Sequence, residues 1–321
     1  MNKESNLKII ECKDDKKWDN FVAHSFNQSF YSLSDLLNLD KSTKKYFLFK
    51  NNEILASFCL NEENKKILEP KYRIYSPINY KNFKESKVSS IITNHYNINN
   101  VIYKYLVDNY KKIDITFDYF TKDIRPFLWH GFPKYRQKFN LNIRYTYISD
   151  IKNLDKSKYL SSFIYLNSSE TNRREIRNSL NKNYKFEEIF SKEIFLKLKK
   201  SSYKIHKKEM DFTYYDKLLK CYETLNKKKL LKMYVTFQSS QPVFMTVFGV
   251  LNSKSIFLQS GRNDVADNDN LIGVYTMINS LFNLSRQNIN TIDFEGVNSP
   301  NNSKSKTKFG GFIKPYYTLK I

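Results

Sequence analysis

The residues best suited to chemistry gather near the end of the chain, between positions 292 and 312. Ile292 and Phe294 predict a short buried strand that ends at Glu295. A partly buried carboxylate acquires a raised pKa and can serve as a general base, so Glu295 is the candidate catalytic carboxylate. We expect Asp293, two residues earlier, to lie on the other face of the strand and outside the site. The alternative is that Glu295 is structural and caps the amides of the next loop.

A lysine-rich loop is expected to follow this strand. It carries Lys304, Lys306 and Lys308, and the stretch from Gly296 to Ile321 contains five lysines and no acid. A positive local field of this kind suits an anionic substrate. The alternative is an exposed loop whose lysines serve solubility.

The distribution of glycine points to the same part of the chain. Only seven glycines occur, and six of them follow residue 248: Gly249, Gly261, Gly273, Gly296, Gly310 and Gly311. Glycine is used where the backbone takes unusual angles or approaches a ligand closely. We therefore place the working site in the C-terminal half.

The elements that must position this site form a mixed sheet with helices on its faces. From hydrophobic periodicity we expect, in the second half, a helix capped by Ser168 or Ser169, helices over 194–206 and 211–228, strands over 230–237, 243–251 and 255–260, a polar loop over 261–270, a helix over 271–286, and strands over 291–294 and 312–319. In the first half we expect a hairpin at Asn51-Asn52, two helices within 86–110 separated by an Asn-rich break, and strands over 113–119 and 144–148. This order predicts an α/β (α+β) protein with two lobes, 1–150 and 151–321.

Charge and cysteine content limit the partners and the compartment. The formal net charge is +22, which favours nucleic acid, an anionic membrane surface or a phosphate-bearing substrate. Lysines scattered over solvated faces are the simpler reading. The three cysteines are far apart and the four histidines lack ligand spacing, so we expect a reducing cytoplasm and no metal. Residues 1–6 lack the apolar run of a signal peptide, and no stretch is long enough to span a bilayer, so membrane contact would be peripheral, at the inner face.

Several short segments resemble, in order and spacing, a known superfamily. These segments are Trp18-Asp-Asn-Phe21, Tyr31-Ser-Leu-Ser-Asp-Leu36, Pro126-Phe-Leu-Trp-His-Gly-Phe132, Arg144-Tyr-Thr-Tyr147, Asn172-Arg-Arg-Glu-Ile-Arg177, the hairpin 242–261, Ile292-Asp-Phe-Glu-Gly296, Lys308-Phe-Gly-Gly311 and Pro315-Tyr-Tyr317. Together they resemble the GNAT superfamily, in the two-lobed branch that contains the Fem-type aminoacyl transferases of peptidoglycan synthesis and related envelope N-acyltransferases. The resemblance implies two GNAT-like lobes, each a mixed, mainly antiparallel sheet flanked by helices.

The resemblance also implies roles for particular residues. Arg173, with Arg177 one turn on, corresponds to an arginine that contacts the phosphates of a nucleotide-linked acceptor, whereas a solvated arginine face is the alternative. Lys306 corresponds to a lysine near the carbonyl under attack, although Ser305 stands where that family has phenylalanine. Lys304 or Lys308 could replace it. The donor's pyrophosphate would lie at the start of the 271–286 helix, at Asn270, Leu271, Ile272 and Gly273.

The implied activity is N-acyl transfer. An acyl or aminoacyl group would move onto an amine of a nucleotide-activated or lipid-linked cell-envelope precursor, a sugar or a peptide. Asp264, Asp267 and Asp269 oppose an anion at the donor segment, so the donor stays open among acyl-CoA, acyl carrier protein and aminoacyl-tRNA, with no bound cofactor. The alternative function is a non-catalytic RNA-binding protein on a GNAT-like scaffold, which the net charge alone supports.

Overall fold

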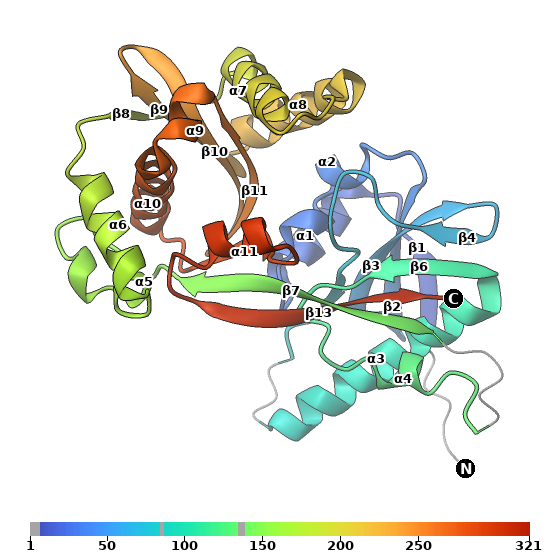
Figure 1. Ribbon diagram of the computed structural model, residues 1–321. Helices are drawn as coiled ribbons and strands as arrows, with labels where there is room; N and C mark the ends of the chain where they lie inside the picture. Colours follow the sequence, from blue (N-terminus) through green and yellow to red (C-terminus); the bar gives the residue numbers. More distant parts are fainter. Residues whose placement is uncertain (1–6, 84–86, 134–138) are drawn as a thin grey trace. The chain divides into compact units, whose positions relative to one another are not determined.

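The computed structural model describes residues 7–83, 87–133 and 139–321, and Figure 1 shows its elements. The chain forms two compact units: unit 1 holds the described residues up to Arg144 together with Pro315–Ile321, and unit 2 holds Tyr145–Lys314. The last seven residues thus return to the first unit, so the units are not two consecutive halves of the chain. Residues 1–6, on which the expected lack of a signal peptide rests, lie outside the described residues.

Unit 1 is built on a sheet with the strand order β1-β2-β3-β4-β6-β13, and β5 pairs with β3. The pairings are antiparallel except for the parallel pair β4 and β6. Its elements are β1 (Leu7–Glu11), α1 (Asp15–His24), η1 (Phe30–Ser32), α2 (Ser34–Leu37), β2 (Thr43–Lys50), β3 (Glu53–Glu63), β4 (Lys66–Leu68), β5 (Ile78–Tyr80), α3 (Val88–Asn109), β6 (Lys112–Thr116), α4 (Arg125–Leu128), the start of β7 (Asn140–Asp150) and the end of β13 (Phe312–Lys320).

Helices cover both faces of this sheet. Phe47 packs against Trp18 of α1, whereas its neighbours in β2, Tyr46 and Leu48, belong to a core cluster that contains Ile102 of α3. Successive side chains of a strand point to opposite faces, so α1 and α3 lie on opposite faces of the sheet. The predicted hairpin at Asn51-Asn52 is confirmed, with Asn51 at φ 55°.

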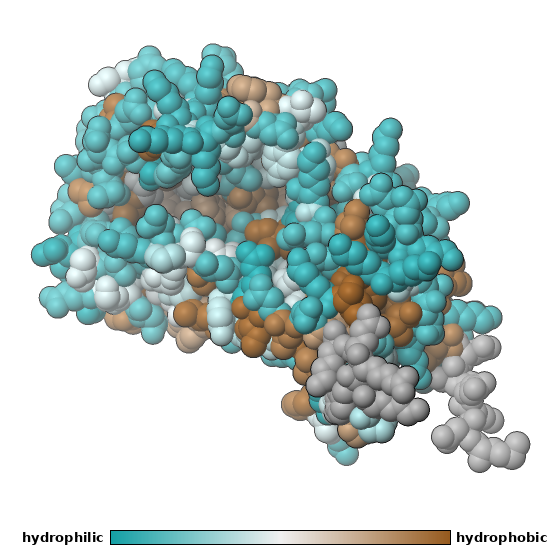
Figure 2. Space-filling model, turned by 45° about the vertical axis from the view of Figure 1, so that its right-hand side comes forward, coloured by the Kyte–Doolittle hydropathy of each residue, from teal (hydrophilic) through white to brown (hydrophobic). Residues whose placement is uncertain are grey.

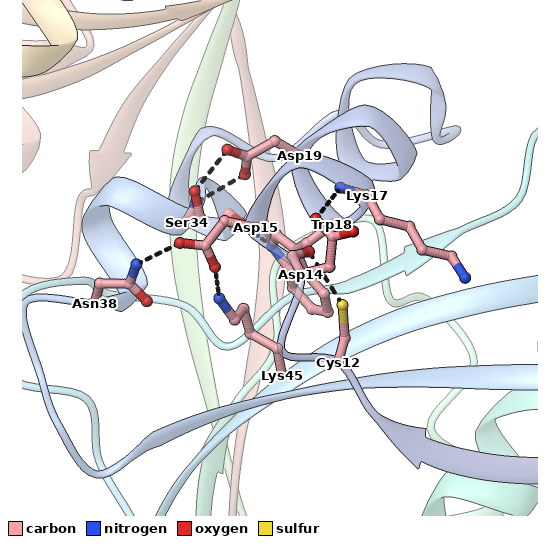
Figure 3. A network of polar contacts seen from close by, with 10 residues as sticks. Cys12, Asp14, Asp15, Lys17, Trp18, Asp19, Ser34, Asn38 and Lys45 are labelled. Carbon is pink, nitrogen blue, oxygen red and sulfur yellow. Dashed lines mark hydrogen bonds and ion pairs between the residues drawn. The ribbon is translucent and has the colours of Figure 1, made fainter.

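Two of the family-like segments of unit 1 meet in a polar network, drawn in Figure 3. Trp18 donates from Nε1 to the carbonyl of Ser32 at 2.6 Å, and Asp19 accepts from the backbone and hydroxyl of Ser34 at 2.8 and 2.6 Å. Asp15 pairs with Lys45 of β2. Ser34 is therefore the first residue of α2 and bonds to α1 instead of capping its own helix, for which the N-cap is Leu33.

The sequence predicted two helices within 86–110, separated by an Asn-rich break, but the structure has a single helix there. α3 is continuous from Val88 to Asn109. Asn99, within that stretch, is buried and exchanges hydrogen bonds with the hydroxyl of Tyr80 and the carbonyl of Asp123, each at 2.8 Å. Tertiary partners thus satisfy a residue that otherwise disfavours helix interiors.

Unit 2 is built on a sheet with the order β7-β12-β11-β10-β9-β8. The pairings are antiparallel except for the parallel pair β11 and β12. Its further elements are η2 (Tyr159–Ser161), α5 (Phe163–Leu166), α6 (Glu170–Leu180), β8 (Lys185–Glu188), α7 (Lys192–Ile205), α8 (Phe212–Lys227), β9 (Leu231–Gln238), β10 (Gln241–Leu251), β11 (Lys254–Arg262), α9 (Asp264–Asn268), α10 (Asn270–Arg286), β12 (Thr291–Gly296) and α11 (Pro300–Lys306).

The helices of unit 2 also lie on both faces of their sheet. Met245 of β10 faces Leu198 of α7 across Gly261, whereas its neighbour Thr246 bonds to Ser280 of α10 at 2.9 Å. Figure 1 accordingly shows α7 and α8 on one side of β10 and α10 with α6 on the other. The predicted fold class, an α/β protein with mixed sheets flanked by helices, is confirmed.

Both segments of unit 2 that were expected to be loops contain a short helix. α9 lies within 261–270, with Asn263 as its N-cap, and α11 lies in the lysine-rich segment that follows β12. Pro300 fits at the start of α11 because the first turn of a helix needs no amide donor. The predicted cap of α6 is correct in one of its two alternatives, since the side chain of Ser169 accepts from the amide of Asn172.

Candidate active site

The parallel strands β11 and β12 pair over only part of their length. The paired residues run from Lys254 with Thr291 to Ile256 with Asp293. Beyond Asp293, β11 continues to Arg262 and β12 to Gly296 without extending this ladder. Glu295 lies just beyond the last paired residue, so the end of β12 is where the predicted catalytic carboxylate emerges from the sheet.

A β-bulge sets the direction of Glu295. Between β12 and β7, Asp293 pairs with Ile148 and Gly296 with Thr146, so β12 carries one residue more than β7 there. Glu295 adopts φ 60°, which is uncommon for a residue with a side chain, and its amide donates to Oδ1 of Asp293 at 2.7 Å. The expectation that Asp293 lies on the other face and outside the site is wrong: side chains of a strand alternate with a period of two, so residues 293 and 295 belong to the same face, and the charges of both carboxylates act on Lys306.

Asp293 is a buried carboxylate, 7% exposed, at the base of this site. Burial raises its pKa to about 6, against the lowering effects of the Thr146 hydroxyl, the Glu295 amide and the charge of Lys306. Thr146 of β7 donates its hydroxyl proton to Asp293. Asp293 is therefore held rigidly and titrates close to neutrality.

Lys306, the last residue of α11, brings a cation to both carboxylates. Its Nζ donates to the carbonyl of Gly296 at 3.1 Å and lies 5.7 Å from the ring centre of Phe257 in β11. Burial lowers the pKa of Lys306, while the charges of Glu295 and Asp293 raise it. Two acids therefore offset the charge of Lys306 in this site. The purely positive local field expected from the sequence is not what the structure has.

The three groups together can perform amine chemistry. Glu295 is 7% exposed at the end of its strand, and Lys306 is half-buried. A carboxylate can accept the proton that an attacking amine loses, and an ammonium group in a low-dielectric setting stabilises a nearby oxyanion. Asp293 fixes the backbone of Glu295 and contributes to the charge balance of Lys306.

The other two lysines of this segment have different surroundings. Lys304 is exposed on α11. Lys308 is ion-paired with Glu175 of α6 at 2.5 Å, and its carbonyl accepts from the hydroxyl of Ser168 at 2.8 Å. Lys308 thus anchors the chain after α11 to α6. Of the three lysines, Lys306 is the one whose charge interacts with both acids of the site.

Gly310 and Gly311 serve packing against their own chain. A Cβ on Gly310 would lie 2.4 Å from the carbonyl oxygen of Ile164, and one on Gly311 would lie 2.4 Å from that of Ile148. Neither has a positive φ; among the described glycines, Gly131 alone does. Of the two reasons for glycine considered from the sequence, unusual backbone angles and close approach, the pair thus serves close approach of backbone to backbone after α11.

The predicted phosphate-contacting arginines converge on one ring. The guanidinium of Arg177 donates to the hydroxyl of Tyr165 at 2.6 Å, and that of Arg173 lies 5.9 Å from the ring centre. Arg173 is half-buried and Arg177 is exposed. α6 therefore presents two cations side by side, and it is joined to the segment after α11 through Glu175 and Lys308.

The predicted donor segment, Asn270 to Gly273, is the first turn of α10. Asp269 caps this turn, because its carboxylate accepts from the amide of Leu271 at 2.9 Å and from the hydroxyl of Tyr184 at 2.7 Å. Ile272 is buried, and Gly273 faces the ring of Phe244. A phosphate at this terminus would have to compete with the Asp269 carboxylate.

Metal and membrane features were searched over the described residues. No group of three or more His, Cys, Asp or Glu side chains in this part of the chain is placed to hold a metal ion. No helix there is long and apolar enough to cross a membrane. On the face drawn in Figure 2, hydrophilic residues predominate, as the many charged residues would suggest.

No family model and no curated protein matches the sequence. Solved structures do match the fold. FemX is 11% identical, with 97% of this chain and 96% of FemX covered at a TM-score of 0.66. L-PGS from Bacillus licheniformis, a lysylphosphatidylglycerol synthetase, is 10% identical, with coverage of 95% and 91% at 0.57. A GNAT-family acetyltransferase from Colwellia psychrerythraea is 8% identical, with coverage of 97% and 99% at 0.50. The chain therefore shares its fold with FemX and with this GNAT-family acetyltransferase, which confirms the fold that the resemblance implied.

Sequence reasoning missed three residues that shape the site. Asp293 was placed on the wrong face, although the period of two already puts it on the face of Glu295. Tyr165, which both arginines contact, precedes the predicted helix and belongs to a separate short helix, α5. Glu175 pairs with Lys308, which is distant in sequence. Glu175 lies between Arg173 and Arg177 in the sequence, so the arginine motif could have drawn attention to it.

Proposed function

We propose that this protein is an N-acyltransferase that moves an acyl or aminoacyl group onto an amine of a cell-envelope precursor. The observation that carries the proposal is the placement of Lys306 against Glu295 and Asp293 where β11 and β12 part, in a Fem-like GNAT fold. FemX and the lysylphosphatidylglycerol synthetase L-PGS share this fold and support the aminoacyl and envelope part of the proposal.

In the proposed reaction the acceptor amine attacks the carbonyl of an activated acyl donor. The new carbon–nitrogen bond forms as the carbonyl becomes an oxyanion, which the ammonium group of Lys306 stabilises. Glu295 accepts the proton that the amine loses. Collapse of the tetrahedral intermediate breaks the bond to the donor's leaving group, so no covalent enzyme intermediate is required.

We assign the acceptor's phosphate groups to α6. Arg173 and Arg177 lie together at Tyr165, and two guanidinium groups suit the diphosphate of a nucleotide-activated or lipid-linked precursor. The protein would work in the cytoplasm and reach a lipid-linked acceptor by peripheral contact with the inner face of the membrane.

For the donor, the proposal favours aminoacyl-tRNA or acyl carrier protein over acyl-CoA. The Asp269 carboxylate occupies the first turn of α10, which disfavours a pyrophosphate at Asn270 to Gly273. Lys227, Lys228 and Lys229 are exposed at the end of α8 and supply a basic surface for either macromolecular donor, whereas Lys232 is ion-paired with Glu188 at 2.7 Å.

The test is a donor-consumption assay with the purified protein. Charged tRNA, acetyl-CoA and acylated carrier protein are incubated with the protein and an amine acceptor, and loss of the acyl group is followed. Release from one donor, abolished by Lys306→Met but not by the matched change Lys304→Met on the same helix, would support the proposal. Equal activity of the two variants would refute the site. No transfer from any donor, with salt-sensitive RNA binding, would favour the RNA-binding alternative.

A further inference from the structure

A second polar pocket lies in unit 2 on the face that carries α7. It has a volume of about 260 Å³ and is formed by the end of α7, the residues after it, the start of β10 and the end of β11. Its basic lining residues are Lys199, His206, Lys208 and Arg262. Lys199 and α7 lie on the face of the sheet opposite α10. The pocket meets the predicted donor segment at Phe244, which lines the pocket and whose ring would lie 3.2 Å from a Cβ on Gly273.

Lys199 is the unusual member of this lining. It is 9% exposed, and its Nζ donates to Oε1 of Gln259 at 2.7 Å and to the carbonyl of Ser260 at 3.2 Å. The rings of Tyr203 and Tyr215 lie 5.8 and 5.6 Å away. All of these partners are neutral, and no carboxylate pairs with Lys199 in the described part of the chain.

A buried ammonium group without a counter-charge is costly, and such groups are normally paired. Burial alone lowers the pKa of Lys199 to about 8, with no acidic neighbour opposing it. The protein nevertheless holds this lysine at a pocket wall instead of in the solvent.

Arg262 adds a second cation with unused bonding capacity. Its Nη2 pairs with Asp267 at 2.7 Å, while its buried Nε has no hydrogen-bond partner. Lys208 and His206 are exposed at the rim. Asp267 is thus the acid that pairs with this basic cluster, and its carboxylate is already bound by Arg262.

The pocket is held by a close contact between α7 and β11. Ser202 of α7 donates to the carbonyl of Arg262 at 3.1 Å and accepts from its amide at 2.7 Å. A Cβ on Gly261 would lie 2.6 Å from Cε of Met245 and 3.1 Å from the backbone of Leu198. Glycine at this position lets α7 approach closely and brings Lys199 over Gln259 and Ser260.

We propose that this pocket binds a phosphate group of a small metabolite, with Lys199 as its buried counter-charge and Arg262 and Lys208 as further donors. Phosphate oxygens match the ammonium and guanidinium donors and supply the negative charge that the pocket lacks. The volume is smaller than that of typical drug-sized ligand sites, which favours an orthophosphate or diphosphate group over a whole nucleotide. The inference does not depend on the proposed transferase activity.

The test is anion binding by the full chain, measured by calorimetry and by the rise in Tm with inorganic phosphate and pyrophosphate at pH 7.5. The wild type should bind at least one of them, and Lys199→Met should weaken binding roughly tenfold or more. Lys200→Met, the neighbouring exposed lysine of α7, makes the same charge change and should leave binding within about twofold. Methionine replaces an uncompensated buried charge, so circular dichroism and Tm without anion should show a folded variant.

A pH series separates Lys199 from general surface charge. Tyr203 of α7, Tyr215 of α8, Arg262 of β11 and the rim residues His206 and Lys208 are the other titratable groups around it. Wild-type binding should fall between pH 7.5 and 9.5 as Lys199 loses its proton, whereas Lys199→Arg should bind equally at both pH values because arginine stays charged. Failure of both anions to bind at 10 mM, or equal binding by Lys199→Met and the wild type, would overturn the proposal.

Discussion

The amide of Glu295 donates a 2.7 Å hydrogen bond to Oδ1 of Asp293, two residues earlier on the same strand. This bond closes the β-bulge that gives Glu295 its φ of 60° and leaves both carboxylates in the field of Lys306. The candidate site is therefore built by a local irregularity of β12.

Removal of the Glu295 carboxylate should affect turnover more than folding. We expect Glu295→Gln to lower kcat by about 100-fold or more, because a positioned general base contributes on that order. Asp293→Asn keeps the side-chain acceptor for the Glu295 amide and should cost less, about tenfold. Steady-state kinetics with the donor that the consumption assay selects measures both; a larger loss in Asp293→Asn than in Glu295→Gln would reverse the assigned roles.

Asp293 should make stability depend on pH. Its pKa is about 6 in the folded chain against an ordinary 3.8, so the folded state holds the proton more tightly than the unfolded state. The tighter proton binding stabilises the folded state by on the order of 3 kcal/mol below about pH 4. This contribution is lost as the pH rises through about 6. Urea unfolding of wild type and Asp293→Asn between pH 4 and pH 7.5 should show the variant gaining stability relative to the wild type as the pH rises. A constant difference across that range would contradict the burial of an ionisable Asp293.

The glycine pair after α11 should tolerate no side chain. Gly310→Ala and Gly311→Ala each place a Cβ against a backbone oxygen that cannot move freely, so we expect a loss of about 2 to 4 kcal/mol in the free energy of unfolding. Gly273→Ala is the control: its nearest contact is the ring of Phe244 at 3.2 Å, and alanine favours the helix, so the change should be within about 1 kcal/mol. Similar losses in all three variants would show that the close approach is not the cause.

The arginines on α6 should act on acceptor binding. We expect Arg173→Ala to raise KM for a diphosphate-bearing acceptor by about tenfold or more while kcat changes little, since a phosphate contact contributes to ground and transition states alike. Arg174→Ala, an exposed arginine on the same helix, is the matched control and should change KM by less than about twofold. Equal effects of the two changes would assign the arginines to general surface charge.

Hydrophobic periodicity identified the longer helices of unit 2, α6, α7, α8 and α10, most of its strands and the fold class, because long amphipathic segments carry a strong signal. It failed where tertiary contacts decide: Asn99 is satisfied inside α3 by Tyr80 and Asp123, and α11 forms in a segment that resembled a loop. The exclusion of Asp293 misapplied the alternation, since residues two apart on a strand share a face. What the sequence did not show is the bulge that gives Glu295 its φ of 60°.

The buried lysine of the second pocket illustrates the same limit. Lys199 lies within a helix that the sequence predicted. The hydrophobic periodicity of that helix could not show that β11 and the rings of Tyr203 and Tyr215 cover the Lys199 ammonium group. Charge counts along the chain likewise could not show which lysines are paired, as Lys308 is with Glu175.

The central claim, acyl transfer at Glu295 and Lys306, is tested most directly by following a radiolabelled acyl group from charged tRNA, acylated carrier protein or acetyl-CoA to an amine acceptor. Transfer should occur from one donor with the wild type and with Lys304→Met, and should fall by about 100-fold with Lys306→Met. Unchanged transfer by Lys306→Met, or no transfer by the folded wild type from any of the three donors, would contradict the claim.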